Sequence, residues 1–318
     1  MSVSIRGKLF SAIARAAGNV NPIVVKEKKK NVVKDLRSME PLFRHYFPPI
    51  GYRFEKSDSD GVPTEIFRPK KDGSENVILV LHGGAYISRM MFYYRLLNKR
   101  YSKASGGGTV VHFDYRCAPE YRYPCALEDT MKVWNRLLKD GYSPENIIIV
   151  GDSAGGHLCV NLMMKLHDLH MAQPRAAVMM SPWLDMTASG KTYMGNYPVD
   201  PVFGIKGKTI QPEEVRDLLM SSELYMWLGD NDRTDPYISP VFAEIDDSYP
   251  PIFVSAGGNE MLLSDAQTLV EKWRKAGLRA ELYVGEGMFH AFEIYQIFPE
   301  AKKGLQAVFA FIREMYAR

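Results

Sequence analysis

Short, mostly apolar runs rich in β-branched residues alternate along this chain with longer segments that are apolar at helical spacing. The clearest runs cover residues 77–81, 109–113, 146–150, 176–180, 251–255 and 280–284. Short apolar runs of this kind are typical of strands buried on both faces of a sheet. Helical patterns cover 126–140, 156–166, 265–275 and the segment from 299 onward, and earlier strands are indicated at 52–54 and 64–67. The alternation predicts an α/β fold, with a mostly parallel twisted sheet flanked by helices.

Two stretches depart from this alternation. Residues 1–50 are helical in pattern and partly basic, whereas residues 188–240 are rich in Gly, Pro, Tyr and Met and hold one isolated helix candidate at 212–228. We therefore divide the chain into an N-terminal segment (1–50), a first core part (51–187), an insertion (188–240) and a second core part (241–318).

The first twenty residues have an amphipathic pattern. Ile5, Leu9, Phe10 and Ile13 recur at helical spacing, so a helix here is able to pack one face on an apolar surface. That surface is either the body of the protein or a membrane, and we favour the first. The segment lacks the uninterrupted apolar core of a secretion signal, and no apolar run in the chain is long enough for a stable membrane span.

Composition excludes several classes of protein. The 318 residues, 46% of them hydrophobic and 24% charged, suit one large α/β domain with an accessory part, or two domains. A net charge of +3 is too small to indicate a nucleic-acid partner. Cys117, Cys125 and Cys159 have no metal-ligand spacing and are too few for a disulfide framework. We therefore expect a reducing, cytoplasmic location and no metal.

A candidate nucleophile follows one of the apolar runs. Residues 151–155 read Gly-Asp-Ser-Ala-Gly, between the expected strand at 146–150 and the expected helix at 156–166. A serine on such a strand-to-helix turn is held with its hydroxyl exposed, and small neighbours let the backbone turn tightly. The helix that begins there points its N–H groups at the same spot, where an oxyanion would form. Ser153 is therefore the candidate nucleophile.

A serine hydroxyl needs a base within hydrogen-bond reach, and functional groups of open α/β sheets gather where strands end. His290 is the best-placed histidine, because it follows the last expected strand and precedes the C-terminal helix. The other histidines that we considered lie inside a strand or on or near the helix after the serine: His112, His157, His167 and His170.

The acid that orients such a histidine has two candidates. Glu260 and Asp265 both follow the expected strand at 251–255. We favour Glu260 because it is nearer the strand end, whereas Asp265 has the position of an ordinary acidic residue at a helix N-terminus. The chain order is then serine, acid, histidine, which is the order of the α/β-hydrolases.

An oxyanion hole is expected in an earlier loop. Residues 82–85 read His-Gly-Gly-Ala and follow the expected strand at 77–81. Glycines allow a backbone to approach a substrate and to direct N–H groups at a developing negative charge. The N–H groups of Gly83, Gly84 and Ala154 would make a site with three donors.

With these residues in place, the chain resembles the α/β-hydrolase fold, and within it the hormone-sensitive-lipase-like esterase group. The matching stretches cover the chain from about residue 50 to its end, in the family's order: 82–85, 115–120, 151–156, 181–185, 235–240 and 290–292.

The resemblance implies a carboxylesterase that hydrolyses short to medium acyl esters of small molecules, without a cofactor. It also implies a helical cap built from residues 1–50 and 188–240, and it allows a homodimer. Two positions depart from the family's usual pattern. Ala85 stands where a third glycine is common, and Glu260 takes the place of the aspartate that many members use as the triad acid.

Three alternatives stay open at the level of sequence. An amidase or deacetylase would use the same triad. A non-catalytic ligand-binding protein would share the fold, as the plant gibberellin receptors do, although loss of the catalytic histidine marks that class. Aromatic and apolar residues of the cap either line a substrate pocket or form the core of the cap itself: Tyr193, Tyr197, Phe203, Tyr225, Met226 and Trp227.

Overall fold

The computed structural model describes residues 3–37 and 46–318, and within them eight strands form one sheet in the order β1-β2-β4-β3-β5-β6-β7-β8. Pairs β1–β2 and β2–β4 are antiparallel and all the other neighbours are parallel. The mostly parallel sheet expected from the sequence is thus confirmed. The strands are β1 (Tyr52–Ser59), β2 (Val62–Pro69), β3 (Val77–Leu81), β4 (Thr109–Phe113), β5 (Ile147–Asp152), β6 (Ala176–Met180), β7 (Ile252–Gly257) and β8 (Ala280–Gly285).

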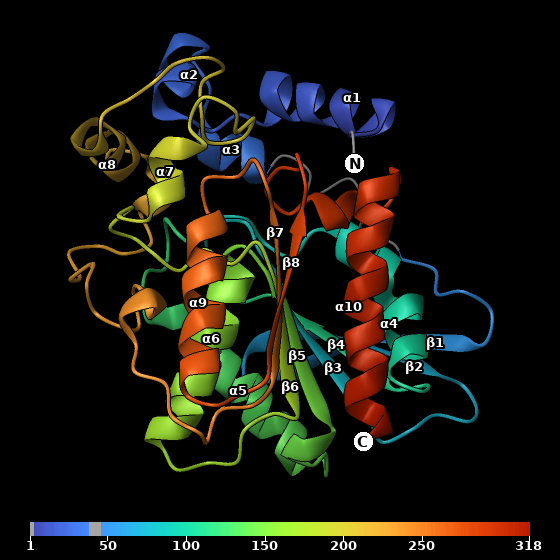
Figure 1. Cartoon of the computed structure of the whole chain (residues 1–318). Coiled ribbons are helices and arrows are strands. Elements are labelled where there is room, and N and C mark those ends of the chain that lie inside the picture. Colours follow the sequence, from blue (N-terminus) through green and yellow to red (C-terminus); the bar gives the residue numbers. More distant parts are fainter. Residues whose placement is uncertain (1–2, 38–45) are drawn as a thin grey trace.

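Helices cover both faces of this sheet (Figure 1). One layer contains α5 (Cys125–Lys139), α6 (Ala154–Asp168) and α9 (Leu263–Lys275), and the other contains α4 (Asn98–Ala104) and α10 (Pro299–Ala317). Strand β3 shows why the central strands are apolar throughout. Ile78 and Val80 pack in a cluster with Leu305 of α10, whereas Leu79 belongs to the opposite cluster, with Leu158 of α6. Successive side chains thus enter different halves of the core.

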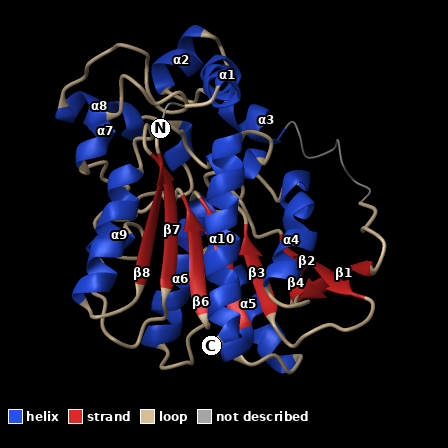
Figure 2. Cartoon of the chain, turned by 45° about the vertical axis from the view of Figure 1, so that its right-hand side comes forward, coloured by secondary structure: helices blue, strands red, loops and turns tan. Residues whose placement is uncertain are grey.

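Among the described residues, five further helices gather beyond the carboxyl ends of the parallel strands (Figures 1 and 2). They are α1 (Ile5–Ile13), α2 (Pro22–Glu27), α3 (Val32–Arg37), α7 (Lys191–Gly195) and α8 (Pro212–Met220). Short turns complete the description: η1 (Ala14–Gly18), η3 (Phe92–Leu97), η4 (Pro144–Asn146), η5 (Glu223–Tyr225), η6 (Pro240–Phe242) and η7 (Phe292–Tyr295).

Side-chain amides join the N-terminal segment to the insertion. Asn19 Nδ2 donates to the carbonyl groups of Pro201 and Gly204, at 3.0 and 2.8 Å. Asn21 Nδ2 donates to Phe203 O at 2.7 Å and to the hydroxyl of Tyr197 at 3.1 Å. Two stretches that are far apart in the sequence therefore form one layer over the sheet.

The helix expected over 212–228 is shorter in the structure. It ends at Met220, and Ser222 adopts an extended conformation (φ −72°, ψ 141°), its hydroxyl accepting a hydrogen bond from the Leu224 N–H at 3.2 Å. A serine that bonds its own neighbourhood competes with helix continuation, which accounts for the early end. Helix α4 was not anticipated, because its seven residues are too few to display a period. No helix among the described residues is both long and apolar enough to cross a membrane.

Candidate active site

Ser153 occupies the sharp turn between β5 and α6. Its backbone is at φ 53° and ψ −119°, a strained conformation for a residue with a side chain. Two glycines make this turn possible. A Cβ added at Gly151 would lie 2.3 Å from Gly155 O, and one added at Gly155 would lie 2.0 Å from Leu81 O. The Gly-x-Ser-x-Gly spacing thus reflects close backbone packing on both sides of the serine.

His290 reaches Ser153 from the loop that follows β8. Its Nε2 lies 2.9 Å from Ser153 Oγ, and its Nδ1 lies 3.5 Å from Oε2 of Glu260. The Glu260 side chain is fully buried, and His290 is largely buried. The structure therefore brings together the three residues that were predicted as nucleophile, base and acid, although Ser153 is more than a hundred positions from the other two in the chain.

Asp265 has a different environment from Glu260. Its Oδ2 accepts hydrogen bonds from the N–H groups of Leu184 and Asp185, at 2.8 and 3.0 Å, and from the hydroxyl of Tyr193 at 3.0 Å. These bonds fasten the segment that follows β6. The geometry therefore favours Glu260 over Asp265 as the partner of His290.

Two titratable groups beside Ser153 have shifted pKa values. Burial alone lowers the pKa of His290, but the nearby Glu260 carboxylate, with smaller contributions from Asp200 and Asp152, outweighs it and raises this pKa above its ordinary 6.5. Burial raises the pKa of Asp152 to about 6. A histidine whose cationic form is stabilised in this way is suited to accept a proton from the serine.

In the loop at 82–85, one of the predicted oxyanion donors already has hydrogen-bond partners. The N–H of Gly83 donates to the hydroxyl of Tyr94 at 2.7 Å and to Oδ1 of Asp152 at 3.2 Å, so it is already engaged. Gly84 and Ala85 instead line the cavity at Ser153, with φ of 110° and 54°. Within the described part of the chain, neither of their N–H groups has a hydrogen-bond partner.

Ala85 was therefore missed as a candidate donor. Position 85 lacks the glycine that is common there in the family. The direction of the Ala85 N–H depends on backbone angles, which a sequence does not display. Ala154, the third predicted donor position with Gly83 and Gly84, is the first residue of α6, where an N–H has no partner inside the helix.

Aromatic hydroxyls hold this loop in place. Tyr115 donates to His82 O at 2.7 Å, and its ring stacks on the His82 imidazole with centroids 3.9 Å apart. Tyr94 donates to Asp152 Oδ1 at 2.7 Å while accepting from Gly83. Tyr94 and Ser181, which contacts Glu260, are site residues that sequence reasoning did not identify. Ser181 opens the family-like stretch 181–185, so a signal for it existed, whereas Tyr94 has none.

Three of the other histidines, His112, His157 and His167, make contacts away from Ser153, and His170 is exposed. Nδ1 of His157 lies 2.5 Å from the hydroxyl oxygen of Tyr86, and its Nε2 lies 2.9 Å from Ile238 O. Burial lowers its pKa to about 4, and that of His112, which contacts Asn98, to about 3. His167 lies on the surface beside Asp246.

Ser153 and His290 open into a mostly apolar cavity of about 200 Å³. Its walls come from both the sheet and the helical layer above it, the latter contributing Ala14, Gly18, Val20, Val202, Phe203, Leu219, Leu224 and Tyr225. Of the six cap residues considered from sequence, Tyr193, Phe203 and Tyr225 line this cavity. Tyr197, Met226 and Trp227 are absent from its lining, so the set divides between pocket and packing.

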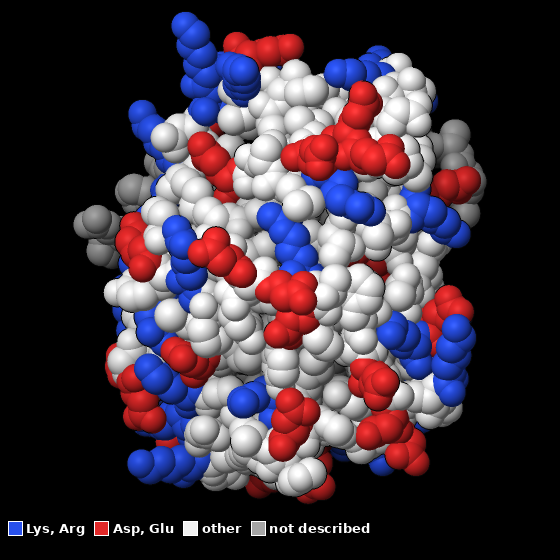
Figure 3. Space-filling view, turned by 90° about the vertical axis from the view of Figure 1, so that its left-hand side faces the viewer, with Lys and Arg blue, Asp and Glu red and all other residues white. Residues whose placement is uncertain are grey.

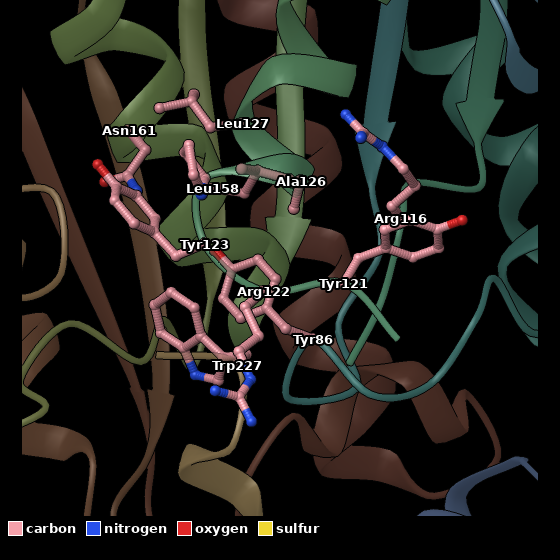
Figure 4. Close-up of a pocket in the computed structure, with 11 residues that line it drawn as sticks. Tyr86, Arg116, Tyr121, Arg122, Tyr123, Ala126, Leu127, Leu158, Asn161 and Trp227 are labelled. Atoms are coloured by element: carbon pink, nitrogen blue, oxygen red, sulfur yellow. The ribbon is translucent and has the colours of Figure 1, made fainter. Parts of the chain in front are cut away.

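A second hollow lies behind Tyr86 (Figure 4). Tyr86, Tyr123 and Trp227 surround it together with side chains of α5 and α6. Its volume is about 10 Å³, which is roughly the space of one water molecule. It is therefore too small for an organic substrate, and the cavity at Ser153 is the candidate active site.

Comparisons with known proteins identify the family of this chain. A family model for the alpha/beta hydrolase fold matches residues 78–294. An esterase of Acinetobacter venetianus is 30% identical over 252 residues, which are 79% of this chain and 78% of that protein. An acetyl-hydrolase of Streptomyces hygroscopicus is 31% identical over 251 residues, 78% and 79% of the two chains. The crystal structure of an esterase from the bacterial hormone-sensitive lipase family superposes with a TM-score of 0.82 at 30% identity, covering 99% of this chain and 100% of that one.

Proposed function

The chain belongs to the α/β-hydrolase fold family, in its hormone-sensitive-lipase-like group of carboxylic ester hydrolases, and we propose that it hydrolyses short to medium acyl esters at Ser153. The observation that carries this proposal is the 2.9 Å contact between Ser153 Oγ and His290 Nε2 at the wall of an apolar cavity. A strained serine beside a histidine is the arrangement that nucleophilic acyl transfer requires.

The proposed reaction begins with transfer of the Ser153 hydroxyl proton to Nε2 of His290. Oγ then attacks the ester carbonyl, and N–H groups of Gly84, Ala85 and Ala154 stabilise the oxyanion. His290 returns the proton to the leaving alcohol, and a water molecule, deprotonated by the same imidazole, hydrolyses the acyl-enzyme. Glu260 orients the imidazole and stabilises its cationic form.

The size of the cavity supports the substrate range. A mostly apolar cavity of about 200 Å³ has room for a short or medium acyl chain. We assign the role of cap to residues 1–50 and 188–240, which supply one wall of the cavity through Ala14, Val20 and Phe203.

The test is hydrolysis of p-nitrophenyl esters from acetate to decanoate by wild type, Ser153→Ala and the surface control Ser248→Ala. We expect turnover with short to medium chains in wild type and control, and a loss of at least about a thousandfold in Ser153→Ala. A folded Ser153→Ala variant with wild-type turnover would contradict the proposed nucleophile.

A matched p-nitroanilide series decides between ester and amide hydrolysis. Faster serine-dependent turnover of the anilides would replace the esterase proposal with an amidase. Binding of ester or anilide without turnover of either would instead favour the ligand-binding alternative.

A further inference from the structure

Helix α1 docks on the body through a face different from the one that its large aliphatic residues suggest. Gly7 and Ala14 are buried, and the Phe10 ring packs on Tyr295 and Phe298 with centroids 5.7 and 5.2 Å apart. At its N-terminus the helix is held by Ser4, whose N–H and hydroxyl donate to the Glu300 carboxylate at 2.6 and 2.8 Å. These contacts fix which side of α1 faces outward.

The outer face of α1 is an exposed aliphatic stripe. Ile5, Leu9 and Ile13 are 87%, 55% and 48% exposed, and their spacing of four residues places them one above another along the helix. The interpretation favoured from sequence placed this helix on the protein's own body, and α1 does dock there, but these three aliphatic side chains are not part of the contact and remain exposed. A row of large aliphatic side chains in water calls for an apolar partner.

Cations flank this stripe. Arg6 and Lys8, both exposed, project on its two sides by the helical rotation of 100° per residue. Residues 1–34 hold eight basic side chains and one acidic side chain, Glu27, although the whole chain has a net charge of only +3. The excess of cations is therefore a local property of the N-terminal segment. On the face of the molecule in Figure 3, basic and acidic side chains interleave.

A basic hollow continues this surface. Lys8, Arg15, Lys28 and Lys206 line it, together with Ser11, Ala12 and Ala16 of the same helical segment. An aliphatic stripe bordered by cations is the pattern of helices that lie in the boundary between lipid headgroups and acyl chains.

A second copy of the chain fits this surface poorly. A two-fold symmetric contact places the same patch on both sides, so it would oppose the cations of one α1 to those of the other. An anionic lipid surface satisfies both features, because its headgroups neutralise the cations while its acyl boundary accepts the aliphatic stripe. We propose that α1 docks the protein on the surface of an anionic lipid bilayer through Ile5, Leu9 and Ile13.

Docking there would bring the bilayer close to the cavity. Ala14 and Gly18, in the turn that directly follows α1, form part of the cavity wall. The lipid surface and the cavity would then be separated by about one helix diameter, roughly 10–12 Å. Use of this proximity for esters dissolved in the bilayer rests on the proposed function, whereas the docking itself does not.

The experiment is co-sedimentation of the full chain with phosphatidylcholine vesicles at low and at high salt. The vesicles are prepared with and without about 30% phosphatidylserine as the anionic component. One variant combines Ile5→Ser, Leu9→Ser and Ile13→Ser, with Leu169→Ser as control, since Leu169 is 48% exposed outside this segment. A second combines Arg6→Gln and Lys8→Gln, with Lys70→Gln and Lys71→Gln as control.

We expect wild type and both controls to bind the anionic vesicles, more weakly at high salt. Each α1 variant should lose at least about tenfold in partition coefficient. Hydrolysis of a water-soluble ester by the α1 variants should equal that of wild type, which also shows that they fold. Ser153→Ala should bind vesicles like wild type, so failure of the esterase proposal is distinguishable from failure of docking.

Two results would overturn the proposal. One is absence of wild-type binding to anionic vesicles, or binding that both α1 variants retain. The other is a change of oligomeric state in the Ile5, Leu9 and Ile13 variant, measured by light scattering, in a protein that does not bind vesicles. That result would assign the stripe to a second copy of the chain.

Discussion

The hydroxyl of Ser181 donates a hydrogen bond of 2.7 Å to Oε2 of Glu260, the same oxygen that lies 3.5 Å from His290 Nδ1. Oγ of Ser181 also accepts the N–H of Ala291, the residue after His290, at 2.9 Å. One buried hydroxyl therefore connects the carboxylate to the backbone that carries the imidazole. Since Glu260 and His290 come from different loops, this link helps to fix their distance.

Replacing Ser181 by Ala should lower kcat about tenfold with a smaller effect on KM, because Glu260 would lose a fixing donor. Alanine tolerates the backbone at Ser181 (φ 48°) about as well as serine does. Steady-state kinetics on a soluble ester measures the effect. Ser239→Ala is the matched control, since Ser239 is also a buried serine whose Oγ accepts a backbone N–H, that of Met186. An equal loss of kcat in both variants would contradict a specific link through Ser181.

Glu260→Gln should reduce kcat by about 10³- to 10⁴-fold, as expected when a triad loses its orienting carboxylate. The pKa of His290 should fall as well, because Glu260 is its main raising partner. Activity requires neutral His290, so wild-type activity should decline as pH falls through the raised pKa. In Glu260→Gln, the residual activity should persist to lower pH, which a pH–rate profile measures.

Asp265→Asn serves as the counterpart of that variant. We expect it to lose roughly 1–3 kcal/mol of unfolding free energy, since Asp265 fastens Leu184, Asp185 and Tyr193, while kcat stays within a few-fold of wild type. Chemical denaturation and kinetics on both variants measure this. If Asp265→Asn were stable but inactive while Glu260→Gln remained active, the roles assigned to the two acids would be exchanged.

Tyr94→Phe should lower kcat about tenfold, because the Gly83 N–H and Asp152 Oδ1 both lose a 2.7 Å partner and the oxyanion loop loses its fixed position. KM for a short ester should change less than kcat. Tyr101→Phe is the control, since Tyr101 is buried in α4 against Phe309 of α10. Unchanged kcat in a folded Tyr94→Phe variant would show that the loop keeps its position without this hydroxyl.

Glu293 makes stability depend on pH. Its side chain is buried in η7, and burial raises its pKa to about 7 from an ordinary 4.5. The folded state therefore binds more protons than the unfolded state between pH 4.5 and 7, so this group's contribution to stability is lost as pH rises through that range.

The unfolding free energy of Glu293→Gln relative to wild type should consequently rise by up to about 3 kcal/mol when the pH is raised from 5 to 8. The difference between the two proteins is the relevant quantity, because buried His112 and His157 add an opposite dependence at acid pH. Urea unfolding at both pH values measures it, with exposed Glu145→Gln as control. A difference that is the same at both pH values would contradict the raised pKa.

The sequence by itself determined the sheet and the position of the serine. The run 77–81 is apolar at every position because β3 is buried on both faces, and that pattern is visible without coordinates. The close packing of Gly151 and Gly155 around Ser153 is likewise visible in the sequence, since only glycine fits at these two positions. A buried strand and a tight turn each restrict the residue types at their own positions, so both can be recognised in a short stretch of sequence.

Only the tertiary structure decided which neighbouring groups meet. Glu260 and Asp265 are five positions apart and both are carboxylic acids, yet one lies beside His290 and the other fastens a distant loop. The N–H of Gly83 donates to Tyr94, so Ala85 becomes a donor candidate. Ile5 faces outward on α1 because Phe10 packs on aromatic rings of η7 and at the start of α10. Side-chain partners and N–H directions depend on backbone angles and on segments far away in the chain. No local pattern encodes either one.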